Sequence, residues 1–293
     1  MSGKYTVAEV EARSGVPASS LRQWERRYGF PKPRRSSSGY RLYDDEDLRQ
    51  IEIMRKLIAD GVLASRAAAM VSEQAGARAG PRPLTELTNE LVEALVALED
   101  ARAGRVLSEA FALHDVENVL LDLVTPAMAK IGDLWHSGEI LVATEHFATN
   151  LMQGRLHGLL SLMPGAGRSQ LALVTCAPKE RHELGALILA VLLNRAGFDA
   201  VYLGADTPVH DVVEMARLLR PTAVFISARM DAAVAQLRAH GAELRALEPL
   251  LVFGGHAFGA APALAEELGG LFLGNEIHEV IPEVERLLEA RVA

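Results

Sequence analysis

The run Glu180-Arg181-His182-Glu183-Leu184-Gly185 combines residue types that can hold a metal-bound group. A glutamate two residues before a histidine can accept the second ring N–H of the imidazole, which fixes the tautomer and raises the basicity of the nitrogen left for a metal. A glycine three residues later removes a side chain where a bulky group has to approach. The spacing therefore predicts that His182 binds a metal, that Glu180 orients it and that Gly185 leaves room.

The pattern around this run predicts a parallel sheet. A short apolar run from Gln170 precedes it, and apolar and helical segments then alternate to the end of the chain. We expect further strands at 199–203, 222–226, 250–253 and 271–273, and helices at 182–196, 209–219, 232–247, 261–268 and 277–290. Five βα units of this kind form a doubly wound α/β domain of the flavodoxin-like type, here over 167–293.

Ligands of such sheets bind beyond the carboxyl ends of the strands. Ser227 follows the third expected strand, and Gly254 with Gly255 follows the fourth, so these residues share an edge with His182. The alternative is that His182 is only a loop histidine. We expect Cys176 to be a buried strand end, and His210, His240, His256 and His278 to be solvated or structural.

The series E-x-H-x-x-G, Ser227 and Gly-Gly closely resembles the cobalamin-binding domain of methionine synthase and corrinoid mutases, whose pattern is D-x-H-x-x-G, S-x-L, G-G. The resemblance implies that His182 is the lower axial ligand of cobalt in a cobalamin. It implies a corrinoid site that includes Glu180, Gly185, Ser227, Gly254 and Gly255. The chain departs from the pattern at Glu180, which can still orient the histidine, and at Arg229, which alters the packing near the nucleotide tail.

The segment 84–166 is expected to be a four-helix bundle, with helices near 84–99, 100–113, 115–136 and 140–163. Alone, a tryptophan or histidine at a helix end usually packs or faces solvent. A corrinoid in the next domain would make the bundle a cap over its upper face. The residues that we expect to contact it from the cap are Trp135, His136, Val142, Glu145 and His146.

The N-terminal end is basic although the chain carries a net charge of −8. Residues 1–66 hold thirteen Lys and Arg against nine Asp and Glu, a net of +4, which leaves −12 for the rest. A helix from Tyr5 to Ser14, a turn at Gly15 and a second helix capped by Ser19 or Ser20 form a helix-turn-helix. A β-wing, too rich in proline, serine and glycine for a helix, follows, and then a helix opened by Asp44-Asp45-Glu46.

The alternative for this basic region is a solvated charged face. However, the helix-turn-helix, R-R-S-S-S-G-Y-R-L-Y and D-D-E-D-L together resemble the DNA-binding domain of the MerR family over residues 1–75. The resemblance implies contacts with phosphates or groove edges by a set of six residues, namely Arg22, Arg26, Arg34, Arg35, Tyr40 and Arg41. Trp24 is expected to belong to the core of this domain.

A hinge is expected between the domains, from Glu73 to Pro83, with the linker itself at 76–83. No apolar run is long enough for a membrane span, and the N-terminus has no secretion signal. The single cysteine fits a reducing compartment. We therefore expect a cytoplasmic protein without a membrane partner.

The whole chain resembles the CarH-type photoreceptor repressors. The resemblance implies adenosylcobalamin bound in the dark, with Trp135 and Glu145 beside the adenosyl group, and a homotetramer that represses its operator on double-stranded DNA. We further expect His136 to ligate cobalt from above after light removes the adenosyl group. No residues indicate an enzyme's acid–base pair or nucleophile. A light-independent cobalamin-sensing regulator and a corrinoid methyl carrier remain alternatives.

Overall fold

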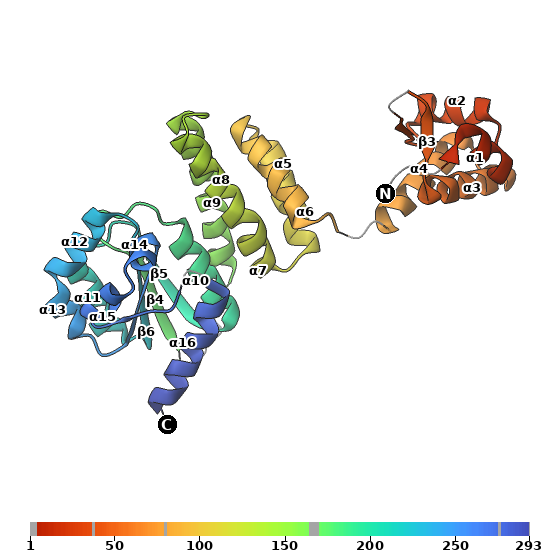
Figure 1. Ribbon diagram of the computed structural model, residues 1–293. Helices are drawn as coiled ribbons and strands as arrows, with labels where there is room; N and C mark the ends of the chain where they lie inside the picture. The colour runs from red at the N-terminus through yellow and green to blue at the C-terminus, as the bar shows by residue number, and fades with distance from the viewer. Residues whose placement is uncertain (1–4, 37–38, 79–80, 164–169, 275–276, 293) are drawn as a thin grey trace. The chain divides into compact units, whose positions relative to one another are not determined.

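The computed structural model describes residues 5–36, 39–78, 81–163, 170–274 and 277–292. It divides into two compact units, Met1–Arg82 and Pro83–Ala293 (Figure 1). Each unit has its own buried hydrophobic core and is described by itself.

The N-terminal unit is a helix-turn-helix with a small antiparallel sheet. Its elements are β1 (Tyr5–Thr6), α1 (Val7–Ser14), α2 (Ala18–Tyr28), β2 (Arg34–Arg35), β3 (Arg41–Tyr43), α3 (Asp45–Ala59) and α4 (Ala64–Arg78). The strand order is β1-β3-β2, so the expected wing is the hairpin β2–β3. The two-residue strand β1, which pairs with β3, was not predicted, because it is too short to show an alternating pattern.

The helix ends in this unit follow from local hydrogen bonds. Thr6 accepts the backbone N–H of Glu9 and so caps α1, which ends at Gly15 with a φ of 68°. Asp44 caps α3 as the acidic cluster predicts. The predicted serine cap of α2 is wrong: this helix begins at Ala18, directly after Pro17, and no side chain caps it.

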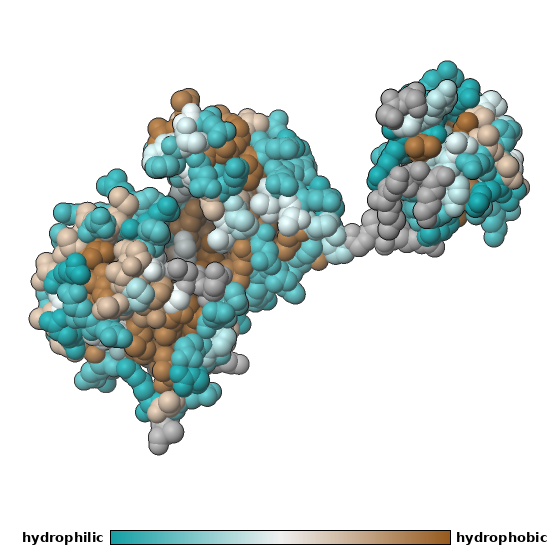
Figure 2. All heavy atoms as spheres, in the orientation of Figure 1, coloured by the Kyte–Doolittle hydropathy of each residue, from teal (hydrophilic) through white to brown (hydrophobic). Residues whose placement is uncertain are grey.

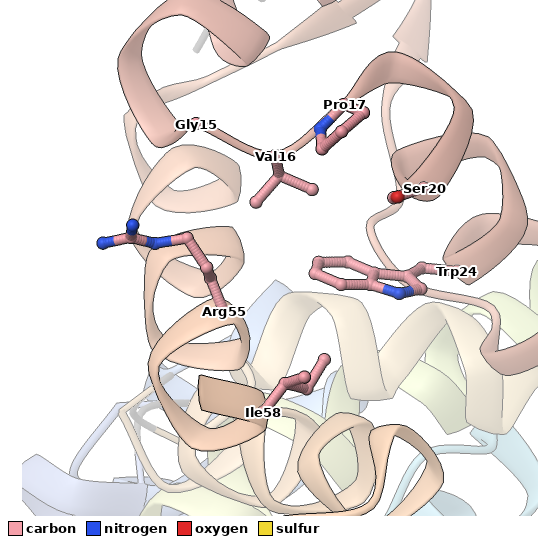
Figure 3. A pocket seen from close by; sticks show the side chains of 7 residues that line it. All are labelled: Gly15, Val16, Pro17, Ser20, Trp24, Arg55 and Ile58. Carbon is pink, nitrogen blue, oxygen red and sulfur yellow. The ribbon is translucent and has the colours of Figure 1, made fainter. Parts of the chain in front are cut away.

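Trp24 packs against the core of the N-terminal unit and is half-buried, as expected. It lines a small pocket of about 160 Å³ below the turn of the helix-turn-helix, together with Val16, Pro17 and Ile58 (Figure 3). Ile51 and Met54 of α3 are fully buried, and Leu48, Ile53 and Leu57 of the same helix are partly buried against their cluster. The apolar face of α3 therefore packs into the core of the N-terminal unit, as its helical spacing predicts.

The hinge prediction is wrong in its first half. Helix α4 continues to Arg78, so the residues from Glu73 to Arg78 are helical, and the two units part at Arg82. Residues 79 and 80 of the expected linker lie outside the described residues.

The second unit starts with the expected bundle. Its elements are α5 (Leu84–Val96), α6 (Asp100–Leu113), α7 (Val116–Asn118), the π-helix η1 (Val119–Val124), α8 (Thr125–His136) and α9 (Val142–Leu162). The π-helix was not predicted. It lies directly before Pro126, whose ring has no N–H and crowds the carbonyl four residues earlier, and Thr125 donates both its N–H and its hydroxyl to the carbonyl of Leu120.

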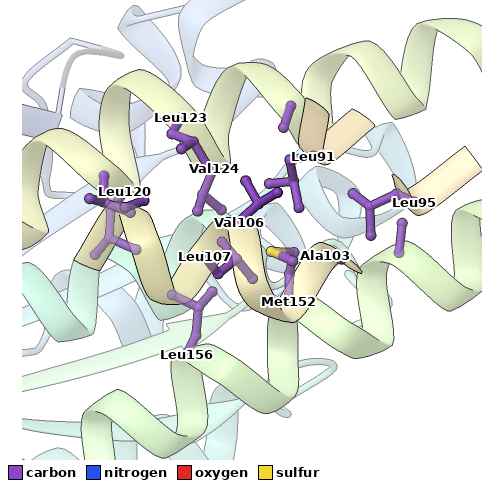
Figure 4. Close-up of a cluster of buried hydrophobic side chains, with 14 of the residues drawn as sticks. Leu91, Leu95, Ala103, Val106, Leu107, Leu120, Leu123, Val124, Met152 and Leu156 are labelled. Atoms are coloured by element: carbon purple, nitrogen blue, oxygen red, sulfur yellow. The ribbon is translucent and has the colours of Figure 1, made fainter. Parts of the chain in front are cut away.

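The bundle and the sheet share one core through helix α10 (Leu184–Ala196). Bundle side chains such as Leu91, Val106 and Met152 point toward one another between the helices (Figure 4). Leu187, Ile188, Val191 and Leu192 of α10 belong to the same buried cluster. Since α10 is also packed against the sheet, the cap helices are held against the domain that carries His182.

The sheet is parallel with the order β5-β4-β6-β7-β8, which confirms the doubly wound fold. Its strands are β4 (Leu171–Cys176), β5 (Asp199–Gly204), β6 (Ala223–Ser227), β7 (Leu250–Gly254) and β8 (Leu271–Phe272). Besides α10, its helices are α11 (Val209–Leu219), α12 (Asp231–Ala239), α13 (Gly241–Arg245), α14 (His256–Ala260), α15 (Ala263–Glu267) and α16 (Ile277–Val292). Among the described residues, no helix is long and apolar enough to cross a membrane.

Three helix predictions need correction. The helix expected at 182–196 begins at Leu184, so His182 lies in the loop before it. The helix expected at 232–247 breaks at His240 into α12 and α13. The segment expected as one helix at 261–268 contains only α15, and a further short helix, α14, begins at His256, right after the glycine pair.

Candidate cofactor site and basic head

The loop after β4 places an oriented imidazole at the sheet edge. Nδ1 of His182 lies 2.6 Å from Oε1 of Glu180, and the backbone N–H of His182 donates to the same oxygen at 2.9 Å. The side chain of Glu180 is fully buried, whereas that of His182 is 53% exposed. The ring is therefore anchored on its protein side and open on the other.

Glu180 also ties this loop to the loop after β6. Its Oε2 accepts the backbone N–H groups of Arg229 at 2.6 Å and Met230 at 3.0 Å. Burial alone would raise the pKa of Glu180, but the hydrogen bonds from His182, Arg229 and Met230 together hold it below its ordinary value. Glu180 is thus a carboxylate at neutral pH.

The charge of Glu180 decides the tautomer of His182. A carboxylate can only accept, so the proton of a neutral imidazole lies on Nδ1 and Nε2 keeps its lone pair. Nε2 has no hydrogen-bond partner among the described residues. A histidine whose Nδ1 is held by a carboxylate while Nε2 stays free is an arrangement typical of metal ligands.

The carboxyl ends of three neighbouring strands meet at the imidazole. Cys176 of β4, Ser227 of β6 and Gly254 of β7 are in register across the sheet, and β4 and β6 flank the point where the strand order reverses. The cavity above this edge has a volume of about 1180 Å³. Figure 2 shows hydrophobic residues in the hollow between the bundle and the sheet domain.

The structure brings most of the predicted site residues to this one cavity. Those that line it are Trp135, His136, Glu145, His146, His182, Gly185, Ser227, Gly254 and Gly255. Val142, at the start of α9, is 48% exposed and is not among the described lining residues. Glu180 does not line the cavity itself, but it is hydrogen-bonded to three residues that do, namely His182, Arg229 and Met230.

The glycines of the site serve two different purposes. A Cβ added at Gly185 or Gly254 would meet no atom within 4 Å, so these positions leave open space beside the imidazole. Gly255 instead has a φ of 93°, and a Cβ there would lie 2.4 Å from the carbonyl oxygen of Ala228. The backbone itself therefore requires glycine at this position.

The opposite wall of the cavity comes from the bundle. Trp135 and His136 lie at the end of α8, where Trp135 is 46% exposed. Glu145 near the start of α9 accepts the hydroxyl of Thr149 at 2.7 Å, which holds its carboxylate toward the helix. An exposed tryptophan and an exposed histidine of the bundle thus line the same cavity as His182.

Sequence reasoning missed some contributors to the site. His256 was expected to be solvated or structural, and it is exposed, but it also lines the cavity. The backbone donors of Arg229 and Met230 have no sequence signal at all. Cys176 is buried as expected, and burial raises the pKa of its thiol to about 12, so it is no nucleophile at neutral pH.

The residues present fit a corrinoid. Such a group needs one imidazole with a free nitrogen, a wide apolar space and a sheet edge without intruding side chains. The cavity exceeds the roughly 300–1,000 Å³ common for small-molecule sites. Of its lining, His182 would hold the metal, and Gly185 and Gly254 would leave space for the ring.

The N-terminal unit presents the predicted cations on its recognition helix and wing. Arg22 and Arg26 of α2 and both arginines of β2 are exposed, and Tyr40 is 73% exposed. Arg41 differs because its guanidinium pairs with Glu25 at 2.7 Å and is only partly exposed. This ion pair links the wing to the recognition helix, and a DNA contact by Arg41 stays a prediction.

In comparisons with known proteins, three family models match successive parts of the chain. Residues 5–74 match the MerR HTH family regulatory protein model. Residues 87–159 and residues 171–276 match two models that are both described as a B12 binding domain. The first of these covers most of the bundle, and the second covers the sheet domain with the His182 loop.

Two curated relatives match about three quarters of the chain. HTH-type transcriptional repressor CarH of Myxococcus xanthus is 31% identical over 76% of this chain and 78% of its own length. HTH-type transcriptional repressor CarA of the same organism is 31% identical over 75% of each chain. The solved monomethylamine corrinoid protein of Methanosarcina barkeri has the same fold over 71% of this chain and its entire length, with a TM-score of 0.59 and 21% identity. The chain therefore belongs to the family of HTH-type transcriptional repressors that includes CarH and CarA, and is a cobalamin-binding regulator with a MerR-type head.

Proposed function

We propose that this protein is a light-responsive repressor that binds operator DNA in the dark and releases it after illumination. In the dark it would carry adenosylcobalamin and act as a homo-oligomer, a tetramer, in the cytoplasm. The observation that carries the proposal is the Glu180–His182 pair, which opens on a large cavity capped by Trp135 and His136, in a chain whose other unit is a basic helix-turn-helix.

The side chains around the cavity have distinct tasks in this proposal. His182 would hold cobalt from below through Nε2, with Glu180 fixing its tautomer. Trp135 and Glu145 would border the adenosyl group from the cap. Bound adenosylcobalamin supplies a cobalt–carbon bond that visible light breaks, and His136 is the residue that we expect to take the upper coordination position afterwards.

Movement of His136 would be passed to the end of α8. Packed interfaces change between discrete arrangements, so a shift of one helix at an assembly surface is enough to favour dissociation. An oligomer that dissociates loses the simultaneous contact of several heads with one operator. Light would therefore weaken DNA binding without a change in the DNA-binding head itself.

The proposal is tested by measuring operator binding of the full chain with and without adenosylcobalamin, first in darkness and then after green light. We expect tight binding only with the cofactor in the dark, and a smaller particle on gel filtration after light. Cofactor-dependent binding that light leaves unchanged would contradict the photoreceptor and favour a light-independent sensor.

Replacing Arg26 with alanine is expected to weaken DNA binding about equally for all sequences, because we expect this exposed cation on α2 to contact a phosphate, which carries no sequence information. The slope of log affinity against log salt concentration should fall by about 1 per head. Arg49→Ala, on α3 and already paired with Glu46, is the matched control and should leave the slope unchanged. Operator affinity that is independent of salt would contradict the basic head.

Replacing His136 with alanine is expected to leave corrinoid binding in the dark intact, since His182 still provides the lower ligand. The absorption spectrum after green light should then differ from that of the parent, because the second histidine ligand is missing. His146→Ala is the comparison from the same wall of the cavity, and we expect the parent photoproduct from it. A photoproduct of His136→Ala with the parent spectrum would remove His136 from its proposed role.

A further inference from the structure

Helix α10 is joined to the bundle at both of its ends. Near its C-terminal end, Arg195 pairs with Glu117 of α7. At its N-terminal end, Glu183 accepts a hydrogen bond from Gln153 of α9. The loop with His182 leads directly into this helix. Glu183, the residue between His182 and the helix, is therefore held between the sheet and the cap.

Both carboxylate oxygens of Glu183 are used, one on each side of this junction. The amide nitrogen of Gln153 donates to Oε1 at 2.6 Å, and the hydroxyl of Tyr202 on β5 donates to Oε2 at 2.5 Å. All three side chains are half-buried, and Glu183 also lines the cavity. The residue next to His182 in sequence is therefore clamped from both halves of the unit.

The hydroxyl of Tyr202 stays protonated and so remains a hydrogen-bond donor to Glu183. Burial, together with the hydrogen bond to Glu183, raises the pKa of its phenol far above the ordinary value, so the hydroxyl keeps its proton. Its ring also lies 6.0 Å from that of His157 on α9, and it interacts with the buried Cys176 of β4. The contact thus rests on a tyrosine that is itself fixed by both the bundle and the sheet.

We propose that Glu183 is a positioning residue for His182. It clasps the loop that carries His182 between Gln153 of the cap and Tyr202 of the sheet. The proposal rests on the proposed corrinoid site and goes beyond it. Glu180 fixes the ring of His182 through Nδ1, whereas Glu183 fixes the backbone on the other side of it. Corrinoid ligation therefore depends on the junction between the two halves, and α9 is coupled to the imidazole.

The variant Glu183→Ala removes both contacts. In the full chain with adenosylcobalamin in the dark, we expect about tenfold weaker binding, the lower end of the effect of outer-shell partners. The absorption band that reports histidine bound to cobalt should also lose intensity at saturating corrinoid, which a purely structural loss elsewhere would not cause. Glu183→Gln should restore both readouts, because its amide can accept from Gln153 while donating to the tyrosine oxygen.

The two halves of the clasp are separated by single changes. Gln153→Leu and Tyr202→Phe each remove one hydrogen bond, and each should weaken binding less than Glu183→Ala does. In the background of Glu183→Ala, neither change should weaken it further. The matched control is Glu117→Ala, which removes the ion pair between Arg195 of α10 and α7 and should change neither affinity nor spectrum.

The outcomes decide between distinct failures. If the parent chain binds no corrinoid, the proposed function is overturned, and with it the clasp that rests on it. If the parent binds and Glu183→Ala matches it in affinity and spectrum, the clasp is overturned. If Glu183→Ala weakens corrinoid binding but Gln153→Leu does not, the coupling to α9 is overturned and Glu183 acts through Tyr202 alone. Thermal unfolding of each variant shows that the compared chains are folded.

Discussion

Replacing His182 with alanine is expected to abolish stable corrinoid binding, with a loss of affinity of more than about 100-fold. The loss should exceed the roughly 10- to 100-fold that outer-shell residues contribute to metal affinity, because the ligand itself is removed. The fold should remain, since the side chain is 53% exposed and contributes nothing to the buried core. Equilibrium dialysis in the dark, with circular dichroism of the same samples, measures both.

The control for this change is His210→Ala, an exposed histidine on α11 that does not line the cavity. It should bind like the parent. A second check is His182→Gly with added imidazole, which should recover part of the binding because Gly leaves space for the free base beside Glu180. His182→Ala with parental affinity would contradict the assignment of this residue as the lower ligand.

Replacing Glu180 with alanine is expected to lower both stability and corrinoid affinity. The change leaves the backbone N–H groups of His182, Arg229 and Met230 without their acceptor, and because these hydrogen bonds are only partly buried we expect each loss to cost about 1 kcal/mol, the lower end for an unpaired donor. We expect the free energy of unfolding in urea to fall by about 3 kcal/mol. Corrinoid affinity should fall by about 10- to 100-fold because the imidazole loses its orienting partner.

Glu214→Ala is the control for the stability effect, since its ion pair with Arg217 is exposed and should be worth less than about 1 kcal/mol. The affinity effect has its own test. In a chain that already carries His182→Ala, Glu180→Ala should reduce corrinoid binding no further. An additional loss of the full size would show that Glu180 acts on the corrinoid by another route.

The pH dependence of stability follows from the lowered pKa of Glu180. A carboxyl group whose pKa is lower in the folded chain stabilises it above the ordinary carboxyl pKa, and this contribution disappears as pH falls through the lowered value. Glu180→Ala should therefore lose less stability than the parent between neutral pH and acid. The difference between the two unfolding curves, measured from pH 7 downward, isolates this one group.

Most of the sheet domain could be predicted because each strand is a short apolar run followed by its own helix. The errors lie at the ends of helices. Helix α4 continues to Arg78 although its sequence shows no apolar period there. Helix α10 begins after His182 because the loop is held by Glu180 and Glu183.

The candidate site could be predicted as far as its residues lie close in sequence. Glu180 and His182 are two positions apart, and their pairing follows from that spacing alone. The donors on Arg229 and Met230 are about fifty residues away and are backbone groups, so no residue type indicates them. The pairing of Arg41 with Glu25 could not be predicted either, because a charge pattern shows where cations lie but not which acid each one pairs with.

The central claim is that the imidazole of His182 holds a corrinoid at the sheet edge, and gel filtration of the full chain after incubation with excess adenosylcobalamin in the dark tests it directly. The account predicts that the protein elutes coloured, with one corrinoid per chain and the absorption spectrum of a histidine ligand on cobalt. A protein that elutes colourless, while its circular dichroism shows the folded chain, would contradict it.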